Sequence, residues 1–427
     1  MIKNIFFSVL FLISASASAA PSLTGVDANT AVDPETGIRL PAGFKATVFA
    51  DDVGRLRHIV VADNGWLYGA LARRKEGMGA VAIYDPDGDG KSNERIYFAK
   101  GIQGTGMGIY DGYLYFSTDV SVLRWKLPER GAPEGIPELI AYGFNEERQH
   151  AAKSFALDGM GSLYVNVGAP SNACMKEMRK KGSPGMRPCP ILKNYGGIWK
   201  FDASKQDQDQ MKDGLLFATG IRNAMAIDWN PHANSLYITP HGRDSLLELF
   251  PELYTAEQSA ELPAEELHKV SEGADMGWPY SYYDQFKKER MVMPEYGGDG
   301  ETVATEGQQP IAAFPGHWAP NDMLFARKAT MPAEYHTGAF IGFHGSWNRA
   351  PLPQQGYRIA YVPMDSAGNV TGDWVTFADG FAGVDVIKSP RDAKHRPMGL
   401  AEGADGALYV SSLMSGGRVW KITYEGK

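Results

Sequence analysis

The stretch FATGIRNAMAIDWNPHANSLYITPHGRDS, residues 217–245, contains the unit that decides the fold. At its centre is NSLYI, residues 234–238, in which a turn former and a small residue precede a β-rich run. Such a pattern is typical of a short β-strand entered from a tight turn. Just upstream, Arg222 and Asn223 form a polar pair in front of an apolar segment.

Six copies of this turn-and-strand unit occur along the chain. They begin at Asp63 (DNGWLYGA), Asp111 (DGYLYFS), Gly159 (GMGSLYVNVG), His232 (HANSLYITP), His336 (HTGAFIGFHG) and Ala404 (ADGALYVSS). Five contain a Leu-Tyr pair, and Phe340-Ile341 takes its place in the remaining copy. The pairs at positions 67, 114 and 163 are 47 and 49 residues apart, close to the ~40–50 residues of a four-stranded propeller blade.

The longer later intervals indicate one blade plus an insertion. We therefore predict an all-β fold, a six-bladed β-propeller with loop and helical insertions, over residues 43–427. The strand-like residues 43–50 begin it, and the one convincing helix is expected at residues 256–270, where PAEE resembles a helix start. A β-sandwich with accidental Leu-Tyr strands is the alternative, which six regular units disfavour.

Residues 1–19 have the features of a secretory signal peptide. Lys3 supplies the positive start, an apolar run follows, and the segment ends in Ala17-Ser18-Ala19, which fits the cleavage pattern. The run is too short to cross a bilayer, which takes ~20 residues, and no later stretch suits a transmembrane helix. We expect an exported protein, periplasmic or secreted, with residues 20–42 as an extended lead-in.

The net charge of the chain is −8, with 44% hydrophobic residues. This composition fits an ordinary globular protein, and the acidic balance disfavours nucleic acid or an anionic membrane as a partner.

The two cysteines, Cys174 and Cys189, are expected to form a disulfide, because exported proteins meet an oxidising compartment. The bond would close a loop of about 15 residues and stabilise the fold by roughly 3 kcal/mol. Two free thiols are the alternative. A two-cysteine metal site is disfavoured, because no nearby His or Cys pair completes it.

Polar residues precede several repeats at matching places and are expected near the axis, on one face. His150 comes before the third unit, where it could act as a general base; a surface His beside charged neighbours is an equal alternative. Arg222 and Asn223 stand at the matching place one blade later and could bind an anionic or carbonyl-rich ligand. An Arg salt bridge across blades is the alternative. Lys394 and Arg396 precede the last unit, so a compact anion with several carboxylates would suit the convergence.

Two further motifs have weaker meanings. HGSWNR, residues 344–349, adds the cation Arg349; its Ser and His do not form a strand-to-helix nucleophile elbow, which disfavours a hydrolase. The alternating Asp85, Asp87 and Asp89 resemble the start of a calcium-binding loop. Because position 96 is not Glu and no flanking helices are evident, a plain turn between strands is the first interpretation and a structural calcium the second.

Together these segments resemble the soluble PQQ-dependent sugar dehydrogenases, and within them the L-sorbosone dehydrogenase branch. The matching segments are ALDGMGSLYVNVGAPSN after His150, ATGIRNAMAIDWNP, ITPHGRDS, EGADMGWPYSY, PAEYHTGAFIGFHGSWNR with GYRIAYVP, and RPMGLAEGADGALYVSS. They span roughly residues 43–424, and HGSWNR and GIRNAMAIDWNP are the most specific of them.

The resemblance implies a six-bladed propeller with pyrroloquinoline quinone (PQQ) beside a Ca²⁺ ion in a cleft on one face. It also implies roles for single residues. These are His150 as catalytic base; Arg222 and Asn223 as contacts of the quinone, Arg222 also as a catalytic group; Lys394 and Arg396 as the basic pair on its carboxylates; Arg349 as a further basic contact; and the main-chain oxygens of Gly242 and Arg243 as calcium ligands.

The implied function is a periplasmic oxidoreductase. It would oxidise an aldose, or a sugar aldehyde such as sorbosone, by hydride transfer to the quinone, with His150 taking the hydroxyl proton, Arg222 stabilising developing charge and calcium acting as a Lewis acid. A periplasmic cytochrome or quinone would accept the electrons. The alternatives are a calcium-dependent lactonase, which needs Glu, Asp and Asn side chains around an axial metal, and a non-catalytic propeller that binds sugar or protein.

Overall fold

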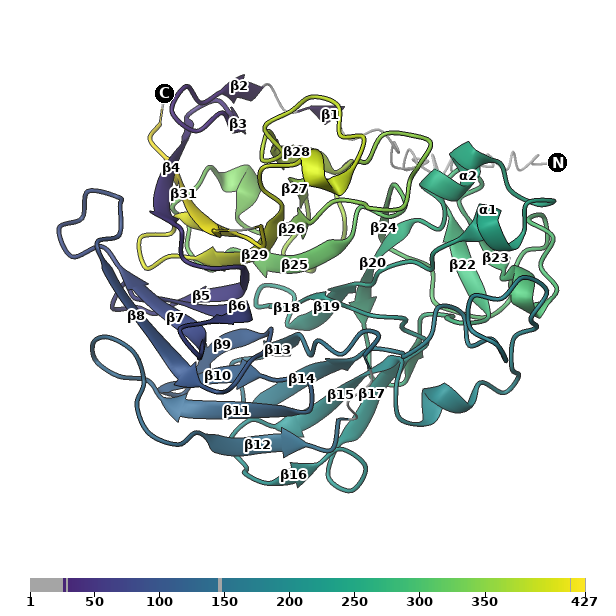
Figure 1. Ribbon diagram of the computed structural model, residues 1–427, viewed down its shortest axis with the longest axis horizontal. Coiled ribbons are helices and arrows are strands. Elements are labelled where there is room, and N and C mark those ends of the chain that lie inside the picture. The colour runs from purple at the N-terminus through teal and green to yellow at the C-terminus, as the bar shows by residue number, and fades with distance from the viewer. Residues whose placement is uncertain (1–25, 28–29, 145–147, 415, 427) are drawn as a thin grey trace, which may run out of the picture.

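The computed structural model of the chain describes residues 26–27, 30–144, 148–414 and 416–426. Six of the sheets that its strands form are placed around a central axis (Figure 1). The first strand of each sheet contacts the first strands of the two neighbouring sheets, so that six strands close a ring around the axis. This arrangement is a six-bladed β-propeller and confirms the predicted fold.

The blades follow one another along the chain, and each is an antiparallel sheet of four strands from the axis outward. Blade 1 is β5 (Leu56–Val61), β6 (Leu67–Lys75), β7 (Met78–Tyr84) and β8 (Glu94–Lys100); blade 2 is β9 (Met107–Tyr110), β10 (Tyr113–Ser117), β11 (Ser121–Lys126) and β12 (Glu138–Tyr142); blade 3 is β13 (Phe155–Leu157), β14 (Ser162–Val167), β15 (Gly197–Asp202) and β17 (Leu215–Thr219). Blade 4 is β18 (Ala226–Asn230), β19 (Ser235–Thr239), β20 (Glu265–Val270) and β24 (Ala312–Phe314); blade 5 is β25 (Pro320–Phe325), β26 (Ala339–Phe343), β27 (Arg358–Val362) and β28 (Val375–Ala378); blade 6 is β29 (Pro397–Glu402), β30 (Leu408–Ser412), β31 (Arg418–Tyr424) and β4 (Phe44–Asp51).

Short edge strands join some neighbouring blades. After β15 the chain returns to pair β16 (Gln208–Asp209) with β12, and after β20 it returns to pair β21 (Ala274–Asp275) with β17. The remaining elements are β1 (Val26–Asp27) at the edge of β28, the hairpins β2 (Thr30–Val32) with β3 (Arg39–Pro41) and β22 (Ser281–Asp284) with β23 (Glu289–Val292), the helices α1 (Leu246–Leu249) and α2 (Ala256–Glu261), and the 3-10 turns Pro190–Lys193, Pro294–Tyr296, Ala333–Tyr335 and Pro390–Asp392.

The Leu-Tyr pair of the repeat lies in the second strand of its blade. Because successive side chains of a strand point to opposite faces, Leu67 packs between blades 6 and 1, whereas Tyr68 packs between blades 1 and 2. The hydroxyls of Tyr68, Tyr115 and Tyr237 donate to backbone carbonyls of the following blade, over 2.9, 2.8 and 2.9 Å. The repeat therefore fastens a blade to both of its neighbours.

In blade 5 the predicted register of the repeat is wrong by one residue. Ala339 and Ile341 pack between blades 4 and 5, whereas Phe340 packs between blades 5 and 6. Ala339-Phe340, not Phe340-Ile341, therefore takes the place of Leu-Tyr. A shift of one residue exchanges the two faces of a strand, and the local pattern does not show which neighbouring blade each side chain meets.

The helix predicted over residues 256–270 is correct only for its first part, residues 256–261. α2 begins at a capping box formed by Thr255 and Gln258 and ends at Glu261. Pro263 then interrupts it, because proline lacks the N–H that a helix interior needs. Residues 265–270 instead form β20, which pairs with β19 and β24, so strand pairing decides the structure of this segment.

The predicted first strand closes the ring. β4 pairs antiparallel with β31, so an early strand and the last strand of the chain share blade 6, as the purple and yellow strands in Figure 1 show. The lead-in is not simply extended, because β2 and β3 form a hairpin and Arg39 bridges to Asp379 beside blade 5.

The predicted signal peptide, residues 1–19, lies outside the described residues. Within the described part of the chain, none of the helices is long and apolar enough to cross a membrane.

The predicted disulfide between Cys174 and Cys189 is present. It closes the insertion between β14 and β15, and both cysteines are buried with Trp278 and Tyr282 in a small apolar cluster. This insertion is thereby tied into a defined shape at the face where it meets the loops of blade 4.

Replacing both cysteines by Ala is expected to lower the free energy of unfolding by about 3 kcal/mol, because a closed 15-residue loop restricts the unfolded chain. Denaturant unfolding with and without reductant measures the change. Reductant should destabilise the parent protein and leave the double variant unaltered. A variant as stable as the oxidised parent would contradict this role of the bond.

Candidate functional site

One face of the propeller collects the loops that carry the candidate residues. In each blade the first strand leaves this face and the second returns to it, because neighbouring strands are antiparallel. The loops before β13, β18 and β29 therefore open on the same face as the loop after β19. They hold His150, the pair Arg222 and Asn223, the pair Lys394 and Arg396, and the pair Gly242 and Arg243.

His150 lies partly buried in the loop before β13, with a left-handed backbone at φ 55°. A non-glycine residue in this region costs about 1–3 kcal/mol, and such strain is concentrated at functional positions. Its Nδ1 lies 2.5 Å from the carbonyl oxygen of Ala169. Since a carbonyl only accepts, Nδ1 carries the proton and Nε2 keeps its lone pair.

The environment keeps His150 neutral. Burial, and after it the neighbouring cation of Arg222, hold the pKa of His150 well below its usual value. Burial and Arg222 also lower the pKa of His241, on the next blade, to about 4. Two neutral imidazoles thus lie beside a permanent cation.

His150 and Asn223 meet above Gly168. A Cβ added at Gly168 would lie 2.6 Å from Oδ1 of Asn223 and 2.8 Å from Cβ of His150, so only glycine fits there. The same Oδ1 accepts a hydrogen bond from Asn166 Nδ2 over 3.0 Å. The structure therefore brings together the predicted base and the predicted Arg222-Asn223 pair.

Asp244 joins several segments of this face, and its importance was not foreseen from the sequence. Its Oδ2 accepts hydrogen bonds from Arg222 over 2.8 Å and from Arg179 over 2.7 Å, and its Oδ1 accepts one from Asn348 over 2.9 Å. Its backbone N–H and C=O also exchange hydrogen bonds of 2.9 Å with the side chain of Asn172. The partners lie 22 to 104 residues away, so no local signal marks the residue beyond an acid within GRDS.

Arg222 is held in place by these contacts. It is buried, and the same Nη2 that binds Asp244 also reaches Asn172 Oδ1 over 3.2 Å. Burial alone would raise the pKa of Asp244, but the cations of Arg222 and Arg179 hold it below its usual value. Asp244 is therefore ionised and fixes the guanidinium of Arg222 beside His150.

Two glutamates, Glu265 and Glu295, hold the loop after β19 in place. Gly242 donates its N–H to Glu265 over 2.9 Å, and burial raises the pKa of Glu265 to about 8. Arg243 turns inward and binds both carboxylate oxygens of Glu295, over 2.6 and 2.7 Å. Among the described residues, none donates a hydrogen bond to the main-chain oxygen of Gly242 or Arg243, so both oxygens remain available to a ligand.

Arg396 reaches the axis, whereas Lys394 points elsewhere. Nε of Arg396 donates to the carbonyl of His344 over 3.0 Å, and its guanidinium lies 5.2 Å from the ring centre of Tyr357. Lys394 is exposed and lines a separate cavity further from the axis. The predicted basic pair is thus divided between two environments, because residues two apart in a loop need not share a face.

Arg349 is buried and binds the insertion that contains α2. Its guanidinium donates to the carbonyls of Ala260, Gly316 and Pro353 and to the carboxylate of Glu261. These contacts join the loop between β26 and β27 to the insertion that contains α2. They do not test the predicted contact of Arg349 with a cofactor, and that contact stays a prediction.

Polar atoms near the axis are left without partners. Within the described residues, Nε of Arg57, Nε of Arg222 and Nε2 of His344 are buried and make no hydrogen bond. Burying such atoms unpaired costs roughly 1–3 kcal/mol each, so a polar ligand is the expected partner. Arg57, His241 and His344 were not predicted as site residues; each lies in or next to a β-strand, and only the ring of blades brings them together.

Asp85, Asp87 and Asp89 lie in the turn between β7 and β8, on the outer side of blade 1. Their carboxylate oxygens lie within 4.8 Å of one another, and Asp85 accepts backbone N–H groups of Gly88 and Gly90. The turn is therefore well formed, and its predicted calcium remains a prediction.

Comparison with known proteins shows the family of the chain. A family model described as TrAA12-like matches residues 38–425. The chain belongs to this family. The PQQ domain of pyranose dehydrogenase from Coprinopsis cinerea, in its holo form, superposes with a TM-score of 0.72 at 19% identity, covering 93% of this chain and 100% of that one. A Carbohydrate-Active Enzymes Family AA12 structure from Trichoderma reesei gives 0.72 at 17% identity, covering 94% and 100%.

A sequence match points the same way. PQQ-dependent pyranose dehydrogenase of Coprinopsis cinerea is 28% identical over 184 residues, which are 36% of this chain and 24% of that protein. The predicted relation to the soluble PQQ-dependent sugar dehydrogenases is therefore confirmed, and with it the prediction of an enzyme. The sorbosone branch stays a prediction.

Arg243→Met is expected to lower the free energy of unfolding by about 3–5 kcal/mol, because it leaves Glu295 as a buried charge without its cation. Denaturant unfolding measures it. Adding Glu295→Met removes the stranded charge, so the double variant should recover much of the loss. A double variant whose loss equals the sum of the two single losses would contradict a specific pair.

Proposed function

We propose that this chain is a PQQ-dependent oxidoreductase that oxidises an aldose or a sugar aldehyde such as sorbosone, with His150 as the general base. The observation that supports it most is the state of His150. A neutral imidazole with its proton on Nδ1 has Nε2 free to accept a proton, and it lies beside the fixed cation of Arg222. A general base must be unprotonated before it acts, and the lowered pKa of His150 meets this condition.

The residues present fit the cofactor. PQQ carries carboxylates and carbonyls, and the unpartnered nitrogens of Arg57, Arg222 and His344 are the kind of groups that would meet them. Arg222, Asn223 and Arg396 would hold it at the axis. Lys394 lines the outer cavity and Arg349 binds the insertion that contains α2, so their predicted contacts with the cofactor find less support. The main-chain oxygens of Gly242 and Arg243 would hold Ca²⁺, which prefers oxygen ligands.

When bound, the quinone supplies the two-electron oxidant and calcium the Lewis acid. The residues of the chain accept the proton and stabilise the developing charge. Nε2 of His150 takes the proton of the substrate hydroxyl, and the carbonyl of Ala169 holds the ring in the required tautomer. Asp244 keeps Arg222 in place, so its positive charge faces the developing negative charge without reorganisation.

The lactonase alternative finds less support. It needs acidic and amide side chains around an axial metal. Among the described residues, the one group of three acidic, His or Cys ligands close enough to share an ion is the turn of Asp85, Asp87 and Asp89 on blade 1. Export to the periplasm or medium, and a cytochrome or quinone as electron acceptor, remain parts of this proposal.

The purified mature chain, loaded with PQQ and calcium, is expected to reduce an artificial dye with aldoses or sugar aldehydes. His150→Ala should abolish turnover, because it removes the proposed base, while PQQ binding, followed by absorbance, is retained. Lactone hydrolysis without PQQ would instead favour the lactonase. Turnover that survives in His150→Ala would show that another residue is the base.

The pH dependence follows from the lowered pKa of His150. The base works only while neutral, so kcat/KM should stay level from about pH 8 to 6 and fall only at lower pH, as the pH passes through the lowered pKa. In the cofactor-free protein, Arg222→Gln should raise the pKa of His150 measured by NMR, since one cause of the lowering is removed. A midpoint near pH 6.5 in the parent protein would contradict the geometry.

A further inference from the structure

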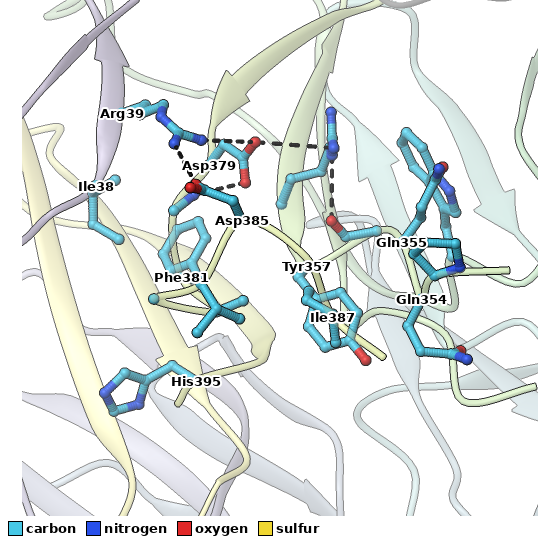
Figure 2. Close-up of a pocket in the computed structure, with 18 of the residues that line it drawn as sticks. Ile38, Arg39, Gln354, Gln355, Tyr357, Asp379, Phe381, Asp385, Ile387 and His395 are labelled. Carbon is cyan, nitrogen blue, oxygen red and sulfur yellow. Dashed lines mark hydrogen bonds and ion pairs between the residues drawn. The ribbon is translucent and has the colours of Figure 1, made fainter. Parts of the chain in front are cut away.

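A cavity of about 1150 Å³ lies on the same face, outward from the axis between blades 5 and 6. Its walls are the loop between β26 and β27, the loop between β28 and β29, and the segment that leads into β3. Figure 2 shows Gln354 and Gln355 on one side of it, Arg39 with Asp379 and Asp385 on another, and Tyr357 and Ile387 between them.

This cavity is separate from the proposed cofactor site. Neither His150 nor Arg222 nor His241 lines it. Tyr357 lines the cavity, and the guanidinium of Arg396, which is outside the lining, lies 5.2 Å from the centre of the Tyr357 ring. A ligand in the cavity would therefore lie next to the cofactor site without occupying it.

Most of the charged side chains that line the cavity are paired. Arg39 pairs with Asp385 over 3.3 Å and with Asp379 over 3.8 Å, and Arg358 pairs with the same Asp379 over 3.9 Å. Burial, and then the cation of Arg418, lower the pKa of His395 to about 4, so its imidazole is neutral at pH 7. Arg418 pairs with Asp51, so among the described lining residues Lys394 is the one Lys or Arg without a carboxylate within 4.0 Å, and it is exposed to solvent. Because the other lining cations already have carboxylate partners, the lining favours an uncharged ligand over an anion.

The polar groups suit a ligand that both donates and accepts. Gln355 is exposed and offers an amide with both functions. Nδ1 of the neutral His395 already contacts the hydroxyl of Ser412 over 3.4 Å, which leaves its Nε2 for a ligand. Asp385 offers acceptors, with 90% of its side chain exposed. A sugar hydroxyl is donor and acceptor at once, so these groups match a polyhydroxylated ring.

The apolar lining residues and the unpaired polar atoms also suit a sugar ligand. Phe286, Val384 and Val386 are exposed apolar lining residues that can pack against the C–H faces of sugar rings. Three residues of the lining, Trp318, Trp420 and Gln285, each have a buried polar atom, Nε1, Nε1 and Oε1 respectively, without a hydrogen-bond partner in the described part of the chain. Leaving such groups unpaired costs free energy, and ligand hydroxyls are the kind of partner that removes this cost.

We propose that this cavity is a non-catalytic binding site for a neutral oligosaccharide. Its volume exceeds that of one sugar ring, and its position beside the proposed cofactor site would hold a glycan close to the place of oxidation. This goes beyond the proposed function, since binding here requires neither PQQ nor calcium.

The test uses the cofactor-free full-length mature protein and isothermal titration calorimetry. The probes are maltotetraose and cellotetraose, with tetragalacturonate as the anionic comparison. At least one neutral tetrasaccharide is expected to bind, and more tightly than the anion. Gln355→Ala with Asp385→Ala should weaken this binding about tenfold, the equivalent of 1.4 kcal/mol.

A matched control removes the same two residue types elsewhere on the surface. Asp63→Ala with Gln309→Ala changes exposed residues outside the cavity and should leave binding unaltered. Thermal unfolding of both double variants checks that they fold.

Three outcomes would overturn the site: no binding of either neutral probe, preference for tetragalacturonate, or equal binding by the cavity variant and the parent. Dye reduction with a monosaccharide should be the same in parent and cavity variant. If neither reduces the dye but the tetrasaccharide still binds, the proposed function fails and the binding site stands.

Discussion

The structure depends on one constraint, which is that the second strand of a blade buries both of its faces. A strand presents alternate side chains to opposite sides, so a Leu-Tyr pair reaches two interfaces at once. In blade 1, Leu67 meets blade 6 and Tyr68 meets blade 2, where its hydroxyl binds a backbone carbonyl. Six such strands around an axis leave no blade without neighbours, and the pairing of β4 with β31 completes the ring.

That ring determines where chemistry can occur. The loops that enter first strands and leave second strands all meet on one face, so residues far apart in sequence become neighbours. Asp244 is the clearest case, because its carboxylate holds Arg222, Arg179 and Asn348 together. Arg179 comes from the loop that the disulfide closes, so an apparently peripheral insertion takes part in fixing a central cation.

The same face contains two environments of different character. Around His150 and Arg222, buried nitrogens are left unpartnered, and among the described residues Asp244 is the one carboxylate that pairs with Arg222. In the outer cavity, Arg39 and Arg358 share the carboxylates of Asp379 and Asp385. The first arrangement suits a charged, carbonyl-rich group and the second a neutral hydroxylated one, and the pair of Tyr357 and Arg396 stands between them.

The sequence by itself determined the number of blades, the strands of the repeat, the disulfide and the loop positions of His150 and Arg222, because turn chemistry, strand alternation and residue spacing are local properties. Only the tertiary structure decided which neighbouring blade Phe340 faces and that residues 265–270 pair as a strand. It also decided that Arg349 binds the end of α2 and that Lys394 and Arg396 lie in different environments. It also revealed Asp244 and the axial Arg57, His241 and His344. These outcomes depend on burial and on contacts between distant segments, whose free energy no local pattern contains.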